Sequence, residues 1–344
     1  MKDSLGNRCV VVARRPRGVP TVEDFELRPA PPPGAGVSAD VLYVSVDPYL
    51  RGRLSGRHVS GPIAPGDPMD SELVVRTTQD SVVGPAGTVA RAFGPWQERV
   101  HLPDAALVPV AADLDPPSLA LGVVGMPGLT AYAGVQRILH PVPGETAVVS
   151  AAAGPVGATV GQLCKAAGAR IIGIAGSAEK RAWLVDEAGF DGCIDRHGSV
   201  RDGLSALCPD GVDMYFDNVG GAVLHAVMER LAPNARVALC GLMEQYNQEA
   251  APPGPNPGLI IRARATVKGL VVYDHEDLRP AMEEDIGGRV RQGALAFREE
   301  VFEGLVQAPG AFCRLMAGQT FGKTVVRIAH KRTERTARSD VVEV

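Results

Sequence analysis

Apolar and polar positions follow two different patterns along this chain, and the clearer one runs from residue 146 to residue 292. There, short apolar runs rich in β-branched residues alternate with segments of about ten residues whose apolar positions recur at helical spacing. Such alternation predicts βαβ units, and therefore a parallel sheet with helices on both faces. The expected strands are 147–149, 170–175, 192–195, 212–218, 236–241 and 266–273, and the expected helices are 155–167, 178–188, 200–207, 222–231 and 278–292.

The second pattern lies in the N-terminal part, from residue 8 to about residue 101, where short runs are separated by Pro and Gly clusters. It predicts a mostly β domain. A helix is expected to start near Gly125, and the strand, helix and strand patterns at 297–302, 308–316 and 324–328 are expected to return to the β domain. The expected N-terminal strands are 9–14, 22–27, 40–46, 87–93 and 97–102.

These patterns give an α/β fold class, with a β-rich domain and a doubly wound parallel-sheet domain of the Rossmann type. With 344 residues the chain is longer than one hydrophobic core usually serves. The expected division is 1–122 for the first part of the β domain, 123–296 for the Rossmann domain, 297–330 for the return, and 331–344 for a disordered tail.

The turn after the first Rossmann strand carries the spacing Ala152-x-Gly154-x-x-Gly157, a variant of the dinucleotide fingerprint. Gly154 would let the backbone approach a pyrophosphate, and Gly157 would let the helix sit close on the strand. The unpaired amides of the helix's first turn would hold the phosphates. A tight strand-to-helix turn of any α/β protein has the same glycines, so both readings stay open at this point.

The second Rossmann strand decides between the two nicotinamide cofactors. In NAD-binding proteins it ends in an acidic residue that accepts from the ribose 2′-hydroxyl. Here it ends Gly173-Ile174-Ala175-Gly176-Ser177, Lys180 follows in the next turn, and Arg196 comes at the end of the third strand. Two cations and no carboxylate favour a 2′-phosphate, which predicts NADPH. The alternative is that Lys180 pairs only with Glu179 or with solvent.

Composition narrows the possible partners. The net charge of −4 predicts no basic face for nucleic acid or anionic membrane, and the chain has neither an N-terminal signal pattern nor an apolar run long enough for a membrane span. We therefore expect a soluble cytoplasmic protein. The cysteines and histidines are scattered, so disulfides and a zinc site are not expected. They are Cys9, Cys164, Cys193, Cys208, Cys240, Cys313, His58, His101, His140, His197, His225, His275 and His330.

Several stretches together resemble one known family, the zinc-independent medium-chain dehydrogenase/reductases of the prostaglandin reductase, 2-alkenal double-bond reductase and curcumin reductase group. The stretches are VDPYLRG at Val46, GMPGLTAY at Gly125, AAAGPVGATVGQLCK at Ala151, GIAGSAEK at Gly173, YFDNVGG at Tyr215, LCGLMEQYN at Leu239 and FGKTVV at Phe321. The resemblance implies a GroES-like catalytic domain, a Rossmann domain inserted into it, NADPH as cofactor and a homodimer. It also implies hydride transfer to the carbon–carbon double bond of an α,β-unsaturated aldehyde or ketone.

The resemblance also implies roles for individual residues. The pyrophosphate turn falls on Gly154, Pro155, Val156 and Gly157, the 2′-phosphate lysine is Lys180, and Arg196 stands where the family typically has a tyrosine. Thr320 stands where the family often has an asparagine before its LGK motif. The other cofactor-binding residues that the resemblance implies are Asn218, Cys240, Gly241 and Tyr246, beside the adenosine and the nicotinamide ribose, and Leu270, Val271 and Val272, facing the nicotinamide.

Two tyrosines are the candidate catalytic residues. Reduction of an activated alkene needs no metal, because the protein has only to position the reactants and to hydrogen-bond the carbonyl oxygen on which charge develops. Tyr246 is the first candidate for that donor and Tyr49 the second. The loop 56–70 and the Pro-rich segment 251–257 are expected to shape the substrate pocket. Two alternatives remain, a quinone reductase of the same superfamily and a non-catalytic NADPH-binding protein.

Overall fold

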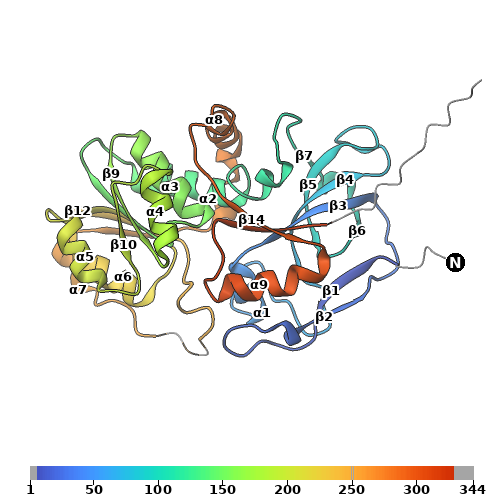
Figure 1. The fold of residues 1–344 in the computed structure, drawn as a ribbon, viewed down its shortest axis with the longest axis horizontal. Coiled ribbons are helices and arrows are strands. Elements are labelled where there is room, and N and C mark those ends of the chain that lie inside the picture. Colours follow the sequence, from blue (N-terminus) through green and yellow to red (C-terminus); the bar gives the residue numbers. More distant parts are fainter. Residues whose placement is uncertain (1–5, 249, 251, 329–344) are drawn as a thin grey trace, which may run out of the picture.

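The computed structural model describes residues 6–248, 250 and 252–328, which form two sheet-centred units side by side (Figure 1). The tail predicted to be disordered, 331–344, lies outside the described residues, as does Ala251 of the Pro-rich segment. The fold class is the predicted one: a β-rich unit built from both ends of the described chain, and a parallel-sheet unit between them. The domain boundaries themselves stay a prediction.

The parallel sheet contains six strands within the described residues, in the order β10-β9-β8-β11-β12-β13. All of its neighbouring strands pair in parallel. This order reverses direction between β8 and β11, which is where open α/β sheets bind their ligands. The strands are β8 (Thr146–Ser150), β9 (Arg170–Ala175), β10 (Gly192–Asp195), β11 (Val212–Asp217), β12 (Leu231–Leu239) and β13 (Thr266–Gly269).

Helices cover both faces of this sheet because successive strand residues point to opposite sides. Ala147 and Val149 of β8 join the core beneath α2, α3 and α8, whereas Val148 joins the core beneath α5 and α6. The helices are α2 (Met126–Gly134), α3 (Pro155–Ala166), α4 (Ala178–Asp186), α5 (Val200–Leu207), α6 (Gly221–Met228), α7 (Gly258–Ala263) and α8 (Arg279–Arg291).

The second sheet runs β14-β15-β3-β4-β5-β7, with β6 on the free part of β3. Strand β15 pairs antiparallel with β3, which brings the C-terminal segment beside the N-terminal strands. The pair β1 (Arg8–Val12) and β2 (Phe25–Pro29) lies beside it. The other elements are β3 (Val37–Val46), α1 (Tyr49–Leu54), β4 (Asp70–Thr77), β5 (Val89–Pro95), β6 (Arg99–Leu102), β7 (Val108–Pro109), β14 (Glu299–Glu303), α9 (Ala308–Met316) and β15 (Lys323–Arg327).

The structure differs from the prediction at several strands. The expected helix 222–231 ends at Met228, because β12 begins at Leu231 rather than at residue 236. The sequence interpretation missed β4, whose first residues are polar and follow a Pro-rich loop. Residues 22–24 of the expected strand 22–27 form a 3-10 turn, because the Asp24 carboxylate accepts from the Thr21 amide. The expected strand 266–273 ends at Gly269, because the chain turns after Leu270 and the Asp274 amide donates to the Val271 carbonyl.

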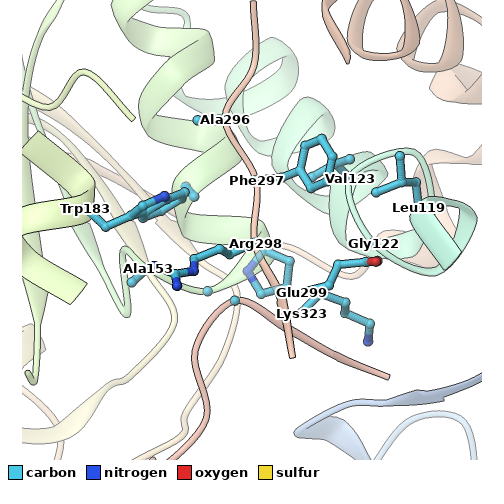
Figure 2. Close-up of a pocket in the computed structure, with 14 residues that line it drawn as sticks. Leu119, Gly122, Val123, Ala153, Trp183, Ala296, Phe297, Arg298, Glu299 and Lys323 are labelled. Carbon is cyan, nitrogen blue, oxygen red and sulfur yellow. The ribbon is translucent and has the colours of Figure 1, made fainter. Parts of the chain in front are cut away.

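Residues 296–299 carry the chain from the parallel-sheet unit back to the β unit, and Figure 2 shows this segment passing between Trp183 and Lys323. The Arg298 guanidinium lies 4.4 Å from the centroid of the Phe321 ring. On another side, Phe321 makes an edge contact with Trp183 of α4, with ring centroids 5.5 Å apart. These contacts join α4 to the turn before β15. Among the described residues, no helix is both long and apolar enough to cross a bilayer.

Candidate cofactor and active site

The turn between β8 and α3 has the geometry that a phosphate-binding turn needs. Gly154 is the N-cap of α3 in an extended conformation, and no side chain caps the helix. A Cβ on Gly157 would lie 2.7 Å from the Ala151 carbonyl oxygen and 2.8 Å from Ala152 Cα, so only glycine fits there. The helix therefore packs closely on the strand, and its first-turn amides face outward without a side-chain partner.

A cavity of about 690 Å³ opens in front of this turn, between the carboxyl ends of the parallel strands and the β unit. The pyrophosphate-turn residues Gly154 and Pro155 line one side of it. Val46, Asp47, Lys323 and Thr324 line the opposite side. Of the predicted cofactor-binding residues, the cavity is lined by Gly154, Pro155, Lys180, Arg196 and Thr320.

Lys180 and Arg196 come together at one end of the cavity, as the prediction requires. Burial, and then the charge of Arg196, lower the pKa of the Lys180 ammonium below its ordinary value. Lys180 Nζ donates to the Gly318 carbonyl at 3.2 Å, across the cleft, and Arg196 makes no ion pair with the residues that the structure describes. The strand tip between them ends in Gly176 and Ser177 without a carboxylate. This end of the cavity is thus suited to a phosphate.

The residues predicted beside the nicotinamide ribose meet at the ends of β11 and β12. The buried Asp217 carboxylate accepts from Ser150 Oγ at 2.9 Å and from the Tyr215 hydroxyl at 2.6 Å, and it holds the Gly220 amide. Asn218 Nδ2 donates to the Ser150 carbonyl at 2.8 Å. This network fixes the loop that follows β11. Asn218 and the neighbouring Cys240 and Gly241 lie just outside the cavity lining.

Cys240 is a partly buried thiol packed against the core of the parallel-sheet unit, and it is not suited to act as a nucleophile. Burial raises the pKa of the Cys240 thiol to about 12, so the thiolate is scarcely populated near neutral pH.

Leu270, another predicted contact, is buried in the core against α2, while Val271 is 38% exposed and Val272 is partly buried. Val156, Gly157 and these three residues are not part of the cavity lining.

The two candidate tyrosines lie in different units. Tyr246 follows β12, and its hydroxyl would lie 3.5 Å from a Cβ placed on Gly241. Tyr49 begins α1 and stacks on His58 with ring centroids 5.1 Å apart. Burial raises the pKa of both phenols above the ordinary value, so each hydroxyl stays protonated and can donate. Neither is in the lining of the 690 Å³ cavity.

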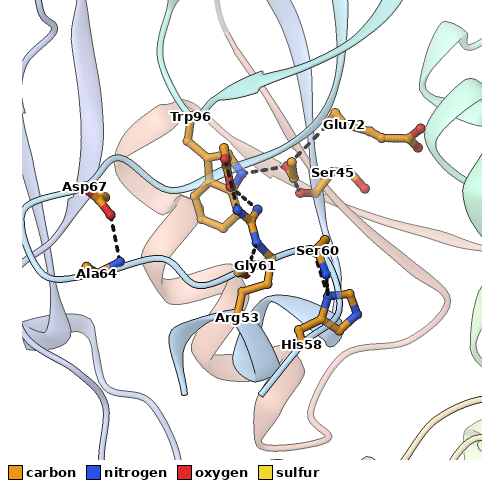
Figure 3. A network of polar contacts seen from close by, with 11 residues as sticks. Ser45, Arg53, His58, Ser60, Gly61, Ala64, Asp67, Glu72 and Trp96 are labelled. Carbon is orange, nitrogen blue, oxygen red and sulfur yellow. Dashed lines mark hydrogen bonds and ion pairs between the residues drawn. The ribbon is translucent and has the colours of Figure 1, made fainter. Parts of the chain in front are cut away.

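The expected pocket loop 56–70 is held by polar contacts that Figure 3 shows. Arg53 pairs with Asp70 and donates from Nε to the Gly61 carbonyl at 3.1 Å. His58 Nδ1 lies 2.7 Å from Ser60 Oγ. Neither this loop nor residues 252–257 line the cavity, so their role in the substrate pocket stays a prediction.

A buried ion pair in the cavity wall was missed by the sequence interpretation. Lys323 Nζ lies 2.5 Å from Asp47 Oδ1 and donates to Ser45 Oγ at 2.7 Å, and the Val46 carbonyl is 3.2 Å away. Lys323 and Asp47 are only 2% and 4% exposed. The signal was present, because both residues stand inside stretches that carry the family resemblance, VDPYLRG and FGKTVV. His197 and Glu244 also line the cavity, and both stand just after a predicted Rossmann strand, where ligands of such sheets bind, although the sequence predicts no specific role for either.

No three His, Cys, Asp or Glu side chains come together as a metal site in the part of the chain that the structure describes.

The comparisons with known proteins agree with the geometry of a nucleotide-binding oxidoreductase. A family model described as "N-terminal domain of oxidoreductase" matches residues 8–110, and one described as "Zinc-binding dehydrogenase" matches residues 155–285.

Similar proteins match over nearly the whole chain. NADPH-dependent curcumin reductase of Escherichia coli (strain K12) is 38% identical over 335 residues, which cover 94% of this chain and 97% of that protein. The 2-alkenal reductase (NADP(+)-dependent) of Nicotiana tabacum is 33% identical, with coverage of 96% and 100%. The crystal structure of CurA in complex with NADPH from Vibrio vulnificus is 36% identical, with a TM-score of 0.88 and coverage of 94% and 100%. The chain belongs to the medium-chain dehydrogenase/reductase family, in the group that contains curcumin reductase, prostaglandin reductase and 2-alkenal reductase.

Proposed function

We propose that this protein is an NADPH-dependent reductase of the carbon–carbon double bond of α,β-unsaturated aldehydes or ketones. The observation that carries the proposal is the cavity between the two sheets, which has an uncapped helix N-terminus on one side and two cations at one end. The names of the relatives support the same activity, since they describe reductases of curcumin, prostaglandins and 2-alkenals, two of them dependent on NADPH or NADP.

The residues present fit the cofactor. At Gly157 a Cβ would clash with the turn, so only glycine fits there. The amides of Val156 and Gly157, which no side chain caps, would hold the pyrophosphate. Lys180 and Arg196 would hold the 2′-phosphate, and Thr320 would form part of the cavity wall beside it. NADPH, when bound, supplies the hydride for the β-carbon of the substrate. Asn218, Cys240, Gly241 and residues 270–272 stay proposed contacts to the nucleoside and nicotinamide ends.

The chain's part in the reaction is to position the substrate and to stabilise the charge that develops on its carbonyl oxygen. A neutral phenol is suited to this task because it donates a hydrogen bond without carrying charge. Tyr246 is the proposed donor, either directly or through the cofactor's ribose, and Tyr49 is the second candidate. Burial of both side chains lowers the local dielectric, which strengthens such a bond.

Replacement of Tyr246 by Phe is expected to lower turnover about tenfold while cofactor affinity stays nearly unchanged, because a hydrogen bond from a neutral group contributes roughly 0.5–1.5 kcal/mol net. Steady-state rates with an enal, together with the dissociation constant for NADPH, measure the two effects separately. Tyr43→Phe is the control, because Tyr43 lies on β3 away from the cavity. Unchanged turnover in the Tyr246 variant would remove this residue from the mechanism.

The function itself is tested with a panel of 2-alkenals, enones and a quinone, following the loss of the near-ultraviolet absorbance of NADPH or NADH. Fast oxidation of NADPH with enals or enones, and formation of the saturated carbonyl product, is the expected result. Preference for the quinone would instead indicate a quinone reductase. Cofactor binding without turnover on any acceptor would indicate a non-catalytic NADPH-binding protein.

We also propose that the protein is a cytoplasmic homodimer that associates through the free edge of β13. Within the described residues β13 pairs only with β12, so its outer main-chain groups are available to a second copy. Ile261 of the neighbouring helix α7 is 75% exposed, so a second copy at this edge would cover it. All six cysteines are free thiols, which suits a reducing compartment.

Replacement of Ile261 by Asp is expected to weaken the dimer at least about tenfold, because a charge would be buried against the partner. Light scattering after size-exclusion chromatography over a dilution series measures the association. Val59→Asp is a matched control, since Val59 is 72% exposed but lies on the other unit. Equal behaviour of the two variants would contradict this interface.

A further inference from the structure

The imidazole of His197 lies at the cationic end of the cavity, beside Lys180 and Arg196. His197 follows Arg196 directly after β10, and both side chains line the cavity. Arg196 Nε donates to His197 Nε2 at 3.2 Å. Because Nε2 accepts this bond, the neutral imidazole carries its proton on Nδ1. The backbone amide of His197 donates to Asp195 Oδ1 at 2.9 Å, which fixes the turn that presents both side chains.

Within the described residues no carboxylate pairs with the Arg196 guanidinium, because the nearby acidic side chains have other partners. Asp195 Oδ2 pairs with Arg181 at 2.9 Å, and its other oxygen is held by the His197 amide, so this nearby acid is occupied. Glu179 lies 3.7 Å from Arg298, and Glu300 pairs with Arg314 at 3.0 Å. Within the part of the chain that the structure describes, the Lys180 ammonium donates only to the Gly318 carbonyl. Lys180 and Arg196 therefore give this end of the cavity excess positive charge, and His197 adds an acceptor beside them.

The tip of β9 is shaped to accept this pair of side chains. A Cβ on Gly176 would lie 3.3 Å from both Arg196 Nε and His197 Nε2. A side chain at this position would therefore require both of these groups to shift by a few tenths of an ångström. With its Nε–H bonded to His197, the guanidinium has two terminal amino groups that make no hydrogen bond within the described residues, and such a pair can bind a phosphate through two parallel hydrogen bonds.

We propose that His197 is a positioning residue that orients Arg196 for the 2′-phosphate of the cofactor, and that it thereby contributes to the choice of NADPH over NADH. The proposal rests on the proposed function, because it assumes that the phosphate binds at this end of the cavity. His197 acts through its acceptor nitrogen, not through its charge. A side chain of similar reach with an acceptor at its end should therefore replace it, and an apolar side chain should not.

The test uses the full-length protein and two soluble probes, adenosine 2′,5′-bisphosphate and adenosine 5′-monophosphate, with dissociation constants measured by titration calorimetry. His197→Leu and His197→Ala are expected to weaken binding of the bisphosphate about five- to tenfold, the size of one ordinary net hydrogen bond. His197→Gln is expected to stay within about twofold of the unmodified protein, because its amide oxygen can accept from Arg196. Binding of the monophosphate is expected to be unchanged in all variants. His225→Leu is the control, since His225 pairs with Glu229 on α6, outside the cavity lining.

The outcomes separate this proposal from the one on which it rests. If the unmodified protein binds the bisphosphate no better than the monophosphate, the assignment of NADPH is wrong and the role of His197 falls with it. If the unmodified protein prefers the bisphosphate but the Leu, Ala and Gln variants all bind it equally well, the positioning role alone is overturned. Equal weakening of all three variants would also overturn it, because the acceptor atom would then not be the feature that matters.

Discussion

Replacing Lys323 by Met is expected to lower the free energy of unfolding of the β unit by about 3–5 kcal/mol, the usual cost of removing one member of a buried ion pair. The variant leaves the Asp47 carboxylate buried, with Ser45 as its remaining side-chain partner. The damage should be local to the β unit, because Lys323 on β15 and Asp47 after β3 join two of its strands.

The chain has two tryptophans, one in each unit, so the unfolding of each unit can be followed separately by fluorescence. Trp96 is buried in the core of the β unit and Trp183 lies in the core of the parallel-sheet unit. In a Trp183→Phe background, urea unfolding followed by fluorescence therefore reports on the β unit alone. The control is the double variant Lys323→Met with Asp47→Asn, which removes the unpaired charge and should be less destabilised than Lys323→Met. A loss below about 1 kcal/mol in the single variant would show that the pair contributes little to stability.

The largest expected effect on function is the loss of cofactor preference when both cations at the cavity end are removed. The double variant Lys180→Ala with Arg196→Ala is expected to raise the Michaelis constant for NADPH about a hundredfold or more, because each charged hydrogen bond to phosphate contributes roughly 1.5–3 kcal/mol. The constant for NADH should change little, since NADH has no 2′-phosphate. Each single variant should show a smaller part of the same selective effect.

Two other cations of the same unit serve as controls. Lys165 pairs with Asp191 at 2.5 Å and Arg201 pairs with Glu229 at 2.5 Å, and neither lines the cavity. Lys165→Ala with Arg201→Ala should leave both Michaelis constants near their original values. Equal losses for NADPH and NADH in the Lys180 and Arg196 variant would defeat the phosphate assignment, because a structural defect does not distinguish the two cofactors. A salt titration adds a second check, since binding of a phosphate between two solvent-accessible cations should weaken as ionic strength rises.

The parts of this protein that depend on local chemistry could be predicted from the sequence alone. The strand, turn and helix from residue 146 to 166 follow from a β-branched run, a proline at the first helical turn and glycines where a Cβ would clash. The alternation of strands and helices predicted the parallel sheet, because only crossovers of helical length connect parallel strands. Lys180 and Arg196 were predicted together because both follow the carboxyl ends of neighbouring strands.

Contacts between residues that are far apart in the sequence depend on the folded structure. So does the conformation of segments whose pattern of apolar and polar residues fits more than one kind of element. Lys323 and Asp47 are 276 residues apart, and nothing in either local pattern shows that one neutralises the other. Strand β4 begins with polar residues and was missed, although its pairing with β3 and β5 holds it in the sheet. Residues 270–273 read as strand, yet the sheet edge ends at Gly269 and Leu270 packs under α2. The hydrogen bond between Arg196 and the imidazole of His197 also could not be predicted, because the direction of a side chain in a turn depends on the elements that surround it.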